Sequence, residues 1–334
     1  MSNTGRRDYL ADLNRQLWEY RKRVFSDADH FFERTSVEQA RRPPVFVRAH
    51  EEENVIVRPG ASPEEIKKVQ SMIAVSARHR WFSSMLSSQA FAQSVFANLL
   101  CLGKLDALAG LRADEGGAAF FEAGHVPGKA TLEYEATYLG EKRKTSVDLF
   151  IQGISRAAVE CKLSEAGVGS CSRPRLRPAD PTFEREHCDG SYTYQRGRTE
   201  RCSLTSIRVR YWEYIPELFD WRPDVDHPHC PIRYTYQLVR NVLAACVRNE
   251  VVVPNGAHAL LVYDRRNPAF QPGGDGMVAY GQVSHALRDR SLLRRCSWQR
   301  ILARLRQDDS LNWLTDPIER KYGLSGRDAA EEAQ

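Results

Sequence analysis

The sequence has no long apolar run. No stretch approaches the roughly 18 consecutive apolar residues of a transmembrane helix, so we expect none. The N-terminal stretch contains basic residues, but no apolar run of about 7–15 residues follows them, so a secretory signal is not expected. Internal repeats and low-complexity tracts are also lacking. These absences favour an ordinary globular protein of the cytoplasm.

The sequence also has no Cys-x-x-Cys pair. Its eight cysteines, in a chain without an expected signal peptide, are read as reduced thiols or metal ligands rather than as a disulfide framework. Cys171, Cys188, Cys202 and Cys230 lie in one irregular stretch. There they either bind Zn²⁺ or an iron–sulfur cluster that braces the segment, or are ordinary reduced cysteines.

Length and composition allow a substantial core. The 334 residues suit one large domain or two small ones, and 42% of them are apolar. There are 48 basic and 43 acidic residues, and the resulting net charge of +5 weakly favours an anionic partner.

The first third of the chain predicts helices. Residues 7–24 have the pattern of an amphipathic helix, and extended segments are expected around 45–58. Ser62, followed by proline and two glutamates, marks a helix start, and the chain then has a helical pattern to about Leu108. Within this run Ser87 or Ser88 is expected to cap a helix, and Gln89 either packs there or faces a site.

The texture changes near residue 130, where polar and apolar residues alternate. Three segments show this period of two: TLEYEATYL (131–139), TSVDLFI (145–151) and AAVECKLS (157–164). Between them, residues 140–144 and 153–156 have the composition of hairpin turns. We predict a three-stranded antiparallel meander.

The remaining chain predicts a mixed α/β fold in one domain. An irregular insertion at about 165–232 precedes a helix (233–249), a buried strand (258–264) and one or two basic helices (285–307). The predicted organisation is therefore an N-terminal helical and extended region (1–80), a core (81–308) and a C-terminal tail (309–334).

Alternation within the strands brings charged residues to one face. Asp148 shares a face with Ser146 and Phe150, and Glu160 shares one with Lys162. If the meander pairs as drawn, these three charges converge and Cys161 points the opposite way. An acid inside an apolar strand such as VDLFI or AVECKL is costly unless it is paired or bound to metal, although a solvated strand face is the alternative. Two carboxylates suit Mg²⁺, with Mn²⁺ as an alternative, and such a site could hydrolyse a phosphodiester.

This arrangement resembles the PD-(D/E)xK nuclease superfamily, whose core runs helix, three strands, helix, strand. The sequence is similar, more specifically, to a family of uncharacterised restriction-endonuclease-like bacterial proteins. The similar strings are SSQAFAQSVF (87–96), SVDLFI (146–151), VECKLSEAGVGSCS (159–172) and YQLVRN (236–241). The proline of the superfamily motif is absent, since Val147 precedes Asp148.

The resemblance implies a restriction-endonuclease-like core and a catalytic set of Asp148, Glu160 and Lys162. It places a polar residue, Gln237, on the helix after the third strand. Arg240 would line the site or grip a phosphate, unless it belongs to an ordinary polar helix face. The earlier carboxylate comes from the first strand, where Glu133 or Glu135 could reach the site, and Glu135 is preferred.

The implied activity is Mg²⁺-dependent hydrolysis of nucleic acid, with double-stranded DNA as the expected partner. Arg196, Arg198 and Arg201 of the insertion would contact phosphates, and the interleaved Tyr211, Trp212 and Tyr214 would stack on bases, unless the insertion is a solvated loop. Two other functions stay open: an RNA nuclease, and a nucleic-acid-binding or assembly module without catalysis. Cutting of both strands would favour a homodimer.

Overall fold

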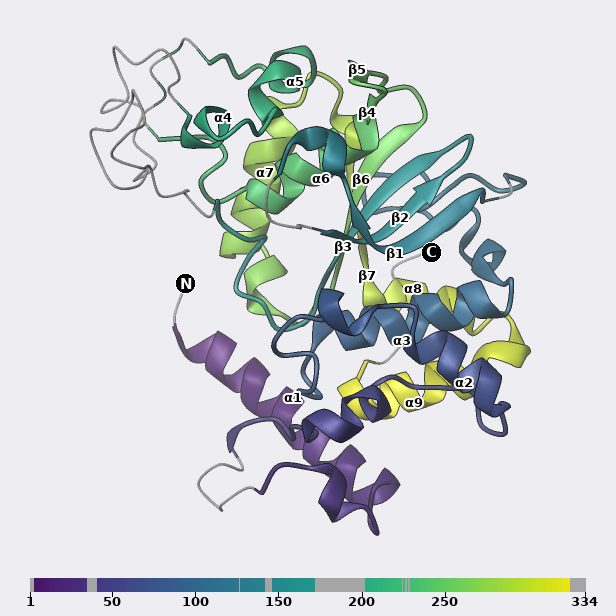
Figure 1. Ribbon diagram of the computed structural model, residues 1–334. Helices are drawn as coiled ribbons and strands as arrows, with labels where there is room; N and C mark the ends of the chain where they lie inside the picture. Colours follow the sequence, from purple (N-terminus) through teal and green to yellow (C-terminus); the bar gives the residue numbers. More distant parts are fainter. Residues whose placement is uncertain are drawn as a thin grey trace.

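The computed structural model describes residues 3–34, 41–125, 127–141, 146–171, 202–223, 225, 227 and 229–324 (Figure 1). Its helices are α1 (Asn3–Val24), α2 (Pro63–Gln70), α3 (Ser88–Cys101), α4 (Ser203–Ser206), α5 (Tyr211–Leu218), α6 (Tyr236–Cys246), α7 (Asp275–Ala286), α8 (Trp298–Leu305) and α9 (Asn312–Tyr322). Its strands are β1 (Lys129–Glu135), β2 (Ser146–Gln152), β3 (Arg156–Lys162), β4 (Val247–Arg248), β5 (Val251–Val252), β6 (Ala257–Tyr263) and β7 (Leu293–Ser297).

A five-stranded mixed sheet with the order β1-β2-β3-β6-β7 forms the centre of the fold. β1, β2 and β3 are the predicted antiparallel meander, whereas β6 runs parallel to β3 and β7 runs parallel to β6. A parallel neighbour needs a long crossover connection, and the chain between β3 and β6 includes α6. The expectation of a mixed α/β fold is confirmed.

Helices cover both faces of this sheet, which gives three layers (Figure 1). Leu149, Val159 and Cys161 belong to the core on one side, together with residues of α1, α3, α8 and α9. Phe150 and Ala158 belong to the core on the other side, together with residues of α5, α6 and α7. Because β6 lies between two strands and is covered on both faces, all seven of its residues are buried.

The first strand of the meander is shorter than the predicted segment 131–139. β1 ends at Glu135, and Thr137–Leu139 form a short 3₁₀ helix instead. Leu139 turns into the core, and its carbonyl accepts a hydrogen bond from Arg210 N at 2.9 Å. Gly140 then takes φ +77°, and a Cβ there would collide with the Arg208 carbonyl. Docking against the segment before α5 therefore overrides the alternation of TLEYEATYL.

The expected helical run from 63 to about 108 is interrupted. Ser62 does begin a helix with a reciprocal capping box to Glu65, but α2 ends at Gln70 and α3 starts only at Ser88. Ser87 is the N-cap of α3 and accepts a hydrogen bond from Ala90 N. The loop between the two helices becomes one wall of the site described below.

The basic segment 285–307 is not helical throughout, because Leu293–Ser297 form the edge strand β7. Leu293 pairs in parallel with Ala259, and Arg295 forms ion pairs with Asp114 and Glu115 at 3.2 and 3.0 Å. These distant acids hold the arginine at the sheet edge. Sequence periodicity alone does not reveal them.

Two regions predicted to lie outside the core contribute to it. The segment 309–334, expected to be a tail, contains α9, whose buried Tyr322 stacks on Phe91 of α3 at 4.5 Å between ring centroids. In the insertion, Tyr211, Trp212 and Tyr214 are buried in α5 and are core residues rather than exposed stacking surfaces. Their burial explains the high aromatic content of the second half of the insertion.

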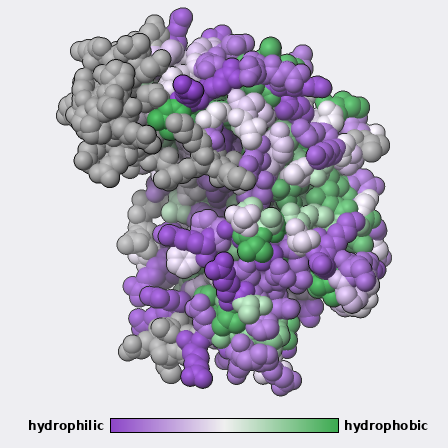
Figure 2. Space-filling view, viewed as in Figure 1, coloured by the Kyte–Doolittle hydropathy of each residue, from purple (hydrophilic) through white to green (hydrophobic). Residues whose placement is uncertain are grey.

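The face of the molecule drawn in Figure 2 is mostly hydrophilic, with smaller hydrophobic patches between the polar regions. Among the helices of the described residues, none is both long and apolar enough to span a bilayer.

Candidate active site

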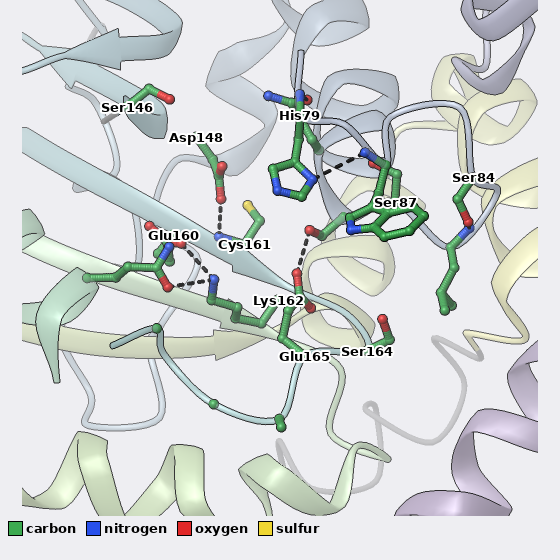
Figure 3. Close-up of a pocket in the computed structure, with 18 of the residues that line it drawn as sticks. His79, Ser84, Ser87, Ser146, Asp148, Glu160, Cys161, Lys162, Ser164 and Glu165 are labelled. Atoms are coloured by element: carbon green, nitrogen blue, oxygen red, sulfur yellow. Dashed lines mark hydrogen bonds and ion pairs between the residues drawn. The ribbon is translucent and has the colours of Figure 1, made fainter. Parts of the chain in front are cut away.

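Strand pairing brings the three charges of the meander together. Leu149 pairs with Val159, so Asp148 and Glu160 come from neighbouring positions of β2 and β3 and share the face of Phe150 and Ala158. Figure 3 shows Asp148, Glu160 and Lys162 beside one another. The side chain of Cys161 belongs to the core of the opposite face, as alternation predicts.

The three charges line a cavity of about 820 Å³. Its walls come from the loop before α3, the start of α3, β1 to β3, the segment after β3, and α6. The lining residues are Pro43, His79, Trp81, Ser84, Leu86, Ser87, Ser88, Gln89, Glu133, Ser146, Asp148, Glu160, Cys161, Lys162, Ser164, Glu165, Ala166, Gly167, Gly169, Gln237 and Arg240.

Glu160 is the centre of a buried charge network. Its Oε1 accepts a hydrogen bond from Lys162 Nζ at 2.8 Å, and its Oε2 accepts from Arg240 at 3.1 Å and from Asn241 at 2.9 Å. Burial alone would raise the pKa of Glu160, but the charges of Lys162 and Arg240 and the hydrogen bonds together lower it. Glu160 is therefore ionised at neutral pH.

Lys162 is held in its charged form by the same network. Burial would lower the pKa of its ammonium, but Glu160, Glu165 and Asp148 raise it above its usual value. Nζ donates to Glu160 Oε1 and to Gln237 Oε1, the latter at 2.9 Å. Because an ammonium has three donors, a third remains for a further oxygen, and the raised pKa keeps the side chain protonated.

Asp148 lies in the opposite electrostatic situation. Burial, then the negative charges of Glu160 and Glu133, raise its pKa well above the usual range. Its Oδ2 accepts a hydrogen bond from the backbone N–H of Cys161 at 2.6 Å, which orients the carboxyl group toward β3. Asp148 is thus destabilised in its ionised form by the site that contains it.

The carboxylate supplied by β1 is Glu133, not the preferred Glu135. Leu132 and Tyr134 pair with Leu149 and Val147, so Glu133 lies opposite Asp148, whereas Glu135 pairs with Ser146 near the end of β2. Glu133 lines the cavity and Glu135 does not. Regular alternation would place both glutamates on one face, but Glu133 takes φ +50° and Tyr134 stacks on Phe150. The register and this local backbone turn together bring Glu133 close to Asp148.

Glu133 is held by two polar neighbours. Gln89 Nε2 donates to its Oε1 at 2.7 Å, and Ser146 Oγ donates to its Oε2. Burial and the charge of Glu160 raise the pKa of Glu133, although these hydrogen bonds oppose the rise. Of the two alternatives for Gln89, the structure therefore favours the one that faces the site.

The two predicted residues of α6 both lie at the cavity wall. Gln237 contacts Lys162, as described above, and Gly169 packs against it with φ +74°, where a Cβ would collide with the Gln237 side chain. The guanidinium of Arg240 pairs with Glu160, and this side chain is only 5% exposed. In this structure Arg240 is therefore a partner of Glu160, and not an open phosphate contact.

Two polar residues of the cavity wall, Glu165 and His79, are not among those predicted from the sequence. Glu165 lines the cavity, accepts a hydrogen bond from Ser88 Oγ at 2.6 Å and another from Leu163 N at 2.7 Å. His79 comes from the loop before α3, and burial, Arg80 and Lys162 lower its pKa. An acid directly after a strand that carries charged residues was a usable signal for Glu165, but no local pattern marks His79.

The end of β3 is anchored from three distant parts of the chain. The carbonyl of Leu163 accepts hydrogen bonds from Tyr9 Oη and Asn267 Nδ2, both at 2.8 Å, and the carbonyl of Lys162 accepts one from Trp298 Nε1 at 3.2 Å. These contacts fix the backbone on which Lys162 and Glu165 are mounted.

The donor chemistry of the cavity suits a hard divalent cation. Four carboxyl groups line it against two cationic side chains, Lys162 and Arg240, which leaves a formal charge of two negatives. Within the described residues, Asp148 and Glu133 have no ion-pair partner. Glu160, in contrast, already uses both oxygens. Among the residues that the structure describes, no group of three or more His, Cys, Asp or Glu side chains is arranged to hold a metal ion.

Only some of the residues predicted to function in the insertion are among the described residues. Arg196, Arg198, Arg201 and Cys188 lie outside the described residues. Cys171, Cys202 and Cys230 are half-buried against the core that contains α5 and α6.

Comparison with known proteins gives one match. A family model described as Restriction Endonuclease associating with ARP matches residues 27–323, which include every described residue of the cavity. No curated protein and no solved structure matches the chain.

Proposed function

Since the chain belongs to the family Restriction Endonuclease associating with ARP, we propose that it is a metal-dependent nuclease of the PD-(D/E)xK type that hydrolyses phosphodiester bonds of DNA. The observation that carries the proposal is the meeting of Asp148, Glu160 and Lys162 in one cavity with a surplus of carboxyl groups. A restriction-endonuclease-like core agrees with the order of α3, the β1–β3 meander, α6 and β6.

The proposed cation is Mg²⁺, with Mn²⁺ as an alternative, and Asp148 and Glu160 would hold it, with Glu133 as the further carboxylate. When bound, it would supply Lewis-acid polarisation of a phosphate oxygen and a water of lowered pKa. Burial first, and the negative charge of Glu160 in addition, raise the pKa values of Asp148 and Glu133. A bound cation would favour the ionised form of both groups.

The role of Lys162 follows from its charge and its contacts. Because its pKa is raised, it stays protonated and does not remove a proton from the attacking water. Its remaining donor instead binds the water or an oxygen of the phosphate, where it stabilises the negative charge that develops in the transition state. Glu160 and Gln237 keep the ammonium in place for this task.

The test is incubation of the purified protein with plasmid DNA, linear DNA and RNA, each with Mg²⁺, Mn²⁺ or EDTA. Cleavage of plasmid that needs the metal and is lost in Lys162→Met agrees with the proposal. Cleavage confined to RNA would support the RNA nuclease, and binding without any cleavage would support the assembly module. Nicked or linear products would separate action on one strand from action on both, for which a homodimer is expected.

Two binding partners are part of the proposal. Double-stranded DNA would be gripped by the basic insertion, so replacement of Arg196, Arg198 and Arg201 with alanine should flatten the salt dependence of binding by about one unit of slope per lost phosphate contact. An unchanged slope would assign these arginines to another role. The family description names association with ARP, and we expect this chain to associate with ARP as well.

A further inference from the structure

One large hydrophobic side chain is exposed at the cavity. Among the large hydrophobic residues that are exposed in the described part of the chain, Trp81 alone belongs to the cavity lining, and it is 57% exposed. An indole offers a broad flat apolar face, here in a wall otherwise rich in acids and hydroxyls.

The loop that carries Trp81 is pinned on both sides. Arg78, before it, forms ion pairs with Glu51 at 2.7 Å and Glu52 at 2.9 Å, and its side chain is 4% exposed. Phe82, after it, is buried, and the Arg78 guanidinium lies 4.7 Å from its ring centre. Residues 79–81 therefore project from two fixed points, so the exposure of Trp81 is a property of a built loop and not of a loose one.

The same loop is tied to the carboxyl groups of the site. Gln89 accepts a hydrogen bond from the His79 backbone N–H at 2.7 Å and donates to Glu133 at 2.7 Å. A single side chain thus fixes the loop relative to the acid that lies opposite Asp148. The backbone two residues before Trp81 is thus tied to a carboxyl group of the cavity.

A planar apolar surface beside a phosphodiester site matches the face of a nucleobase. Stacking needs a base that is free of its neighbours, because both faces of a base inside a duplex are covered. The Arg80 guanidinium lies over the indole ring, 5.0 Å from its centre, so a base would stack on the opposite face. The same guanidinium adds a positive charge near the backbone of such a nucleotide.

We propose that Trp81 stacks on an unstacked nucleobase next to the scissile phosphate, so that the site takes a base released from its neighbours, either in a DNA duplex opened at that base or in a single strand. This inference rests on the proposed nuclease function and names the substrate of that site. Trp81 is a positioning and specificity residue, with no role in the bond-breaking step.

The test measures binding in EDTA, where no cleavage occurs. Fluorescence anisotropy with labelled oligothymidine, the same strand without bases, a matched duplex and a mismatched duplex would compare the parent protein, Trp81→Ala and Trp81→Phe. Trp81→Ala should weaken binding to oligothymidine by roughly 5- to 150-fold, Trp81→Phe by much less, and neither should change binding to the abasic strand. A matching loss on the mismatched duplex, but not on the matched one, would identify extruded bases as a second source.

The matched control is Tyr234→Ala. Tyr234 is also exposed, has the Arg233 guanidinium 4.8 Å from its ring centre, and does not line the cavity, so its loss should leave binding unchanged. Thermal melts check that each variant folds. Equal binding of the parent and Trp81→Ala to oligothymidine overturns the inference, as does an equal loss on the abasic strand. If the parent cuts no nucleic acid with Mg²⁺ while the Trp81→Ala defect is present, the nuclease proposal fails and the stacking role stands.

Discussion

Neutralising two acids of the same site should change stability in opposite directions. The substitutions are Glu160→Gln and Asp148→Asn, each of which removes one negative charge and keeps the shape of the side chain. Both should abolish cleavage, because both remove a proposed metal ligand. Their effects on the free energy of unfolding should differ in sign, since the two acids lie in opposite electrostatic surroundings.

For Glu160→Gln we expect a large loss. Glu160 pairs with Lys162 at 2.8 Å and with Arg240 at 3.1 Å, and the three side chains are all less than a tenth exposed. Without the carboxylate, two buried cations lose the charge that compensates them. Removing one partner of a buried ion pair costs about 3–5 kcal/mol. In a domain of this size that loss lowers the Tm by several degrees.

For Asp148→Asn we expect a gain in the free energy of unfolding. Burial, and then the charges of Glu160 and Glu133, disfavour the ionised carboxyl group, and both costs disappear when asparagine replaces it. The amide oxygen of asparagine can still accept the hydrogen bond from Cys161 N, which Asp148 accepts at 2.6 Å. The raised pKa also predicts that the stability gap between the parent and Asp148→Asn widens as the pH rises, because the folded parent resists ionisation.

Thermal and urea unfolding in EDTA would measure both variants, and a repeat with Mg²⁺ would measure metal binding. The parent should be stabilised by Mg²⁺, and both variants much less so. If Asp148→Asn is destabilised as much as Glu160→Gln, the charges of the cavity are not arranged as described.

Three further outcomes are expected. Lys162→Met should lower the cleavage rate by about 10²–10³-fold, as for loss of one transition-state donor, yet keep the stabilisation by Mg²⁺. Cys161→Ser, on the other sheet face, should cut normally. A plasmid assay with thermal melts measures both, and cleavage by Lys162→Met at the parental rate would show that the assignment is wrong. Glu133→Gln should impair cleavage and Glu135→Gln should not, and the reverse pattern would restore Glu135 as the site carboxylate. Burial lowers the pKa of Lys321 to about 7 from 10.5, so between these pH values the unfolded chain binds more protons than the folded one. The free energy of unfolding should therefore rise with pH in this range, by about 1.4 kcal/mol per pH unit. Lys321→Met should lack this slope, and equal slopes in urea titrations of the two proteins would contradict the prediction.

Local pattern was sufficient to predict the strands that carry Asp148, Glu160 and Lys162. The alternation in SVDLFI and AAVECK reflects one face packed on each core, and it places Asp148, Glu160 and Lys162 on a common side. The order of strands, helix and buried strand also follows from patterning, because a run such as HALLVY only fits where both faces are covered.

Other features depend on contacts between distant segments. The sequence around β7 predicts a helix, because the partners of Arg295, Asp114 and Glu115, lie more than 170 residues earlier in the chain. The helix α9 was read as tail because its apolar face matters only once it packs on α3 and α8. The aromatic residues of α5 were read as exposed because their core exists only after the insertion folds back on α6.

The sequence by itself determined which charges lie in the strands and which face each takes within its own strand, because alternation is a property of a single strand. Tertiary structure decided what each charge does. The pairing of β1 with β2 placed Glu133, and not Glu135, at the cavity. The packing of α6 on the sheet paired Arg240 with Glu160. The loop before α3 placed His79 and Trp81 in the cavity wall. Period-two geometry fixes directions within one element, but the distances between elements, and with them the pKa values of buried groups, are set only when the layers pack.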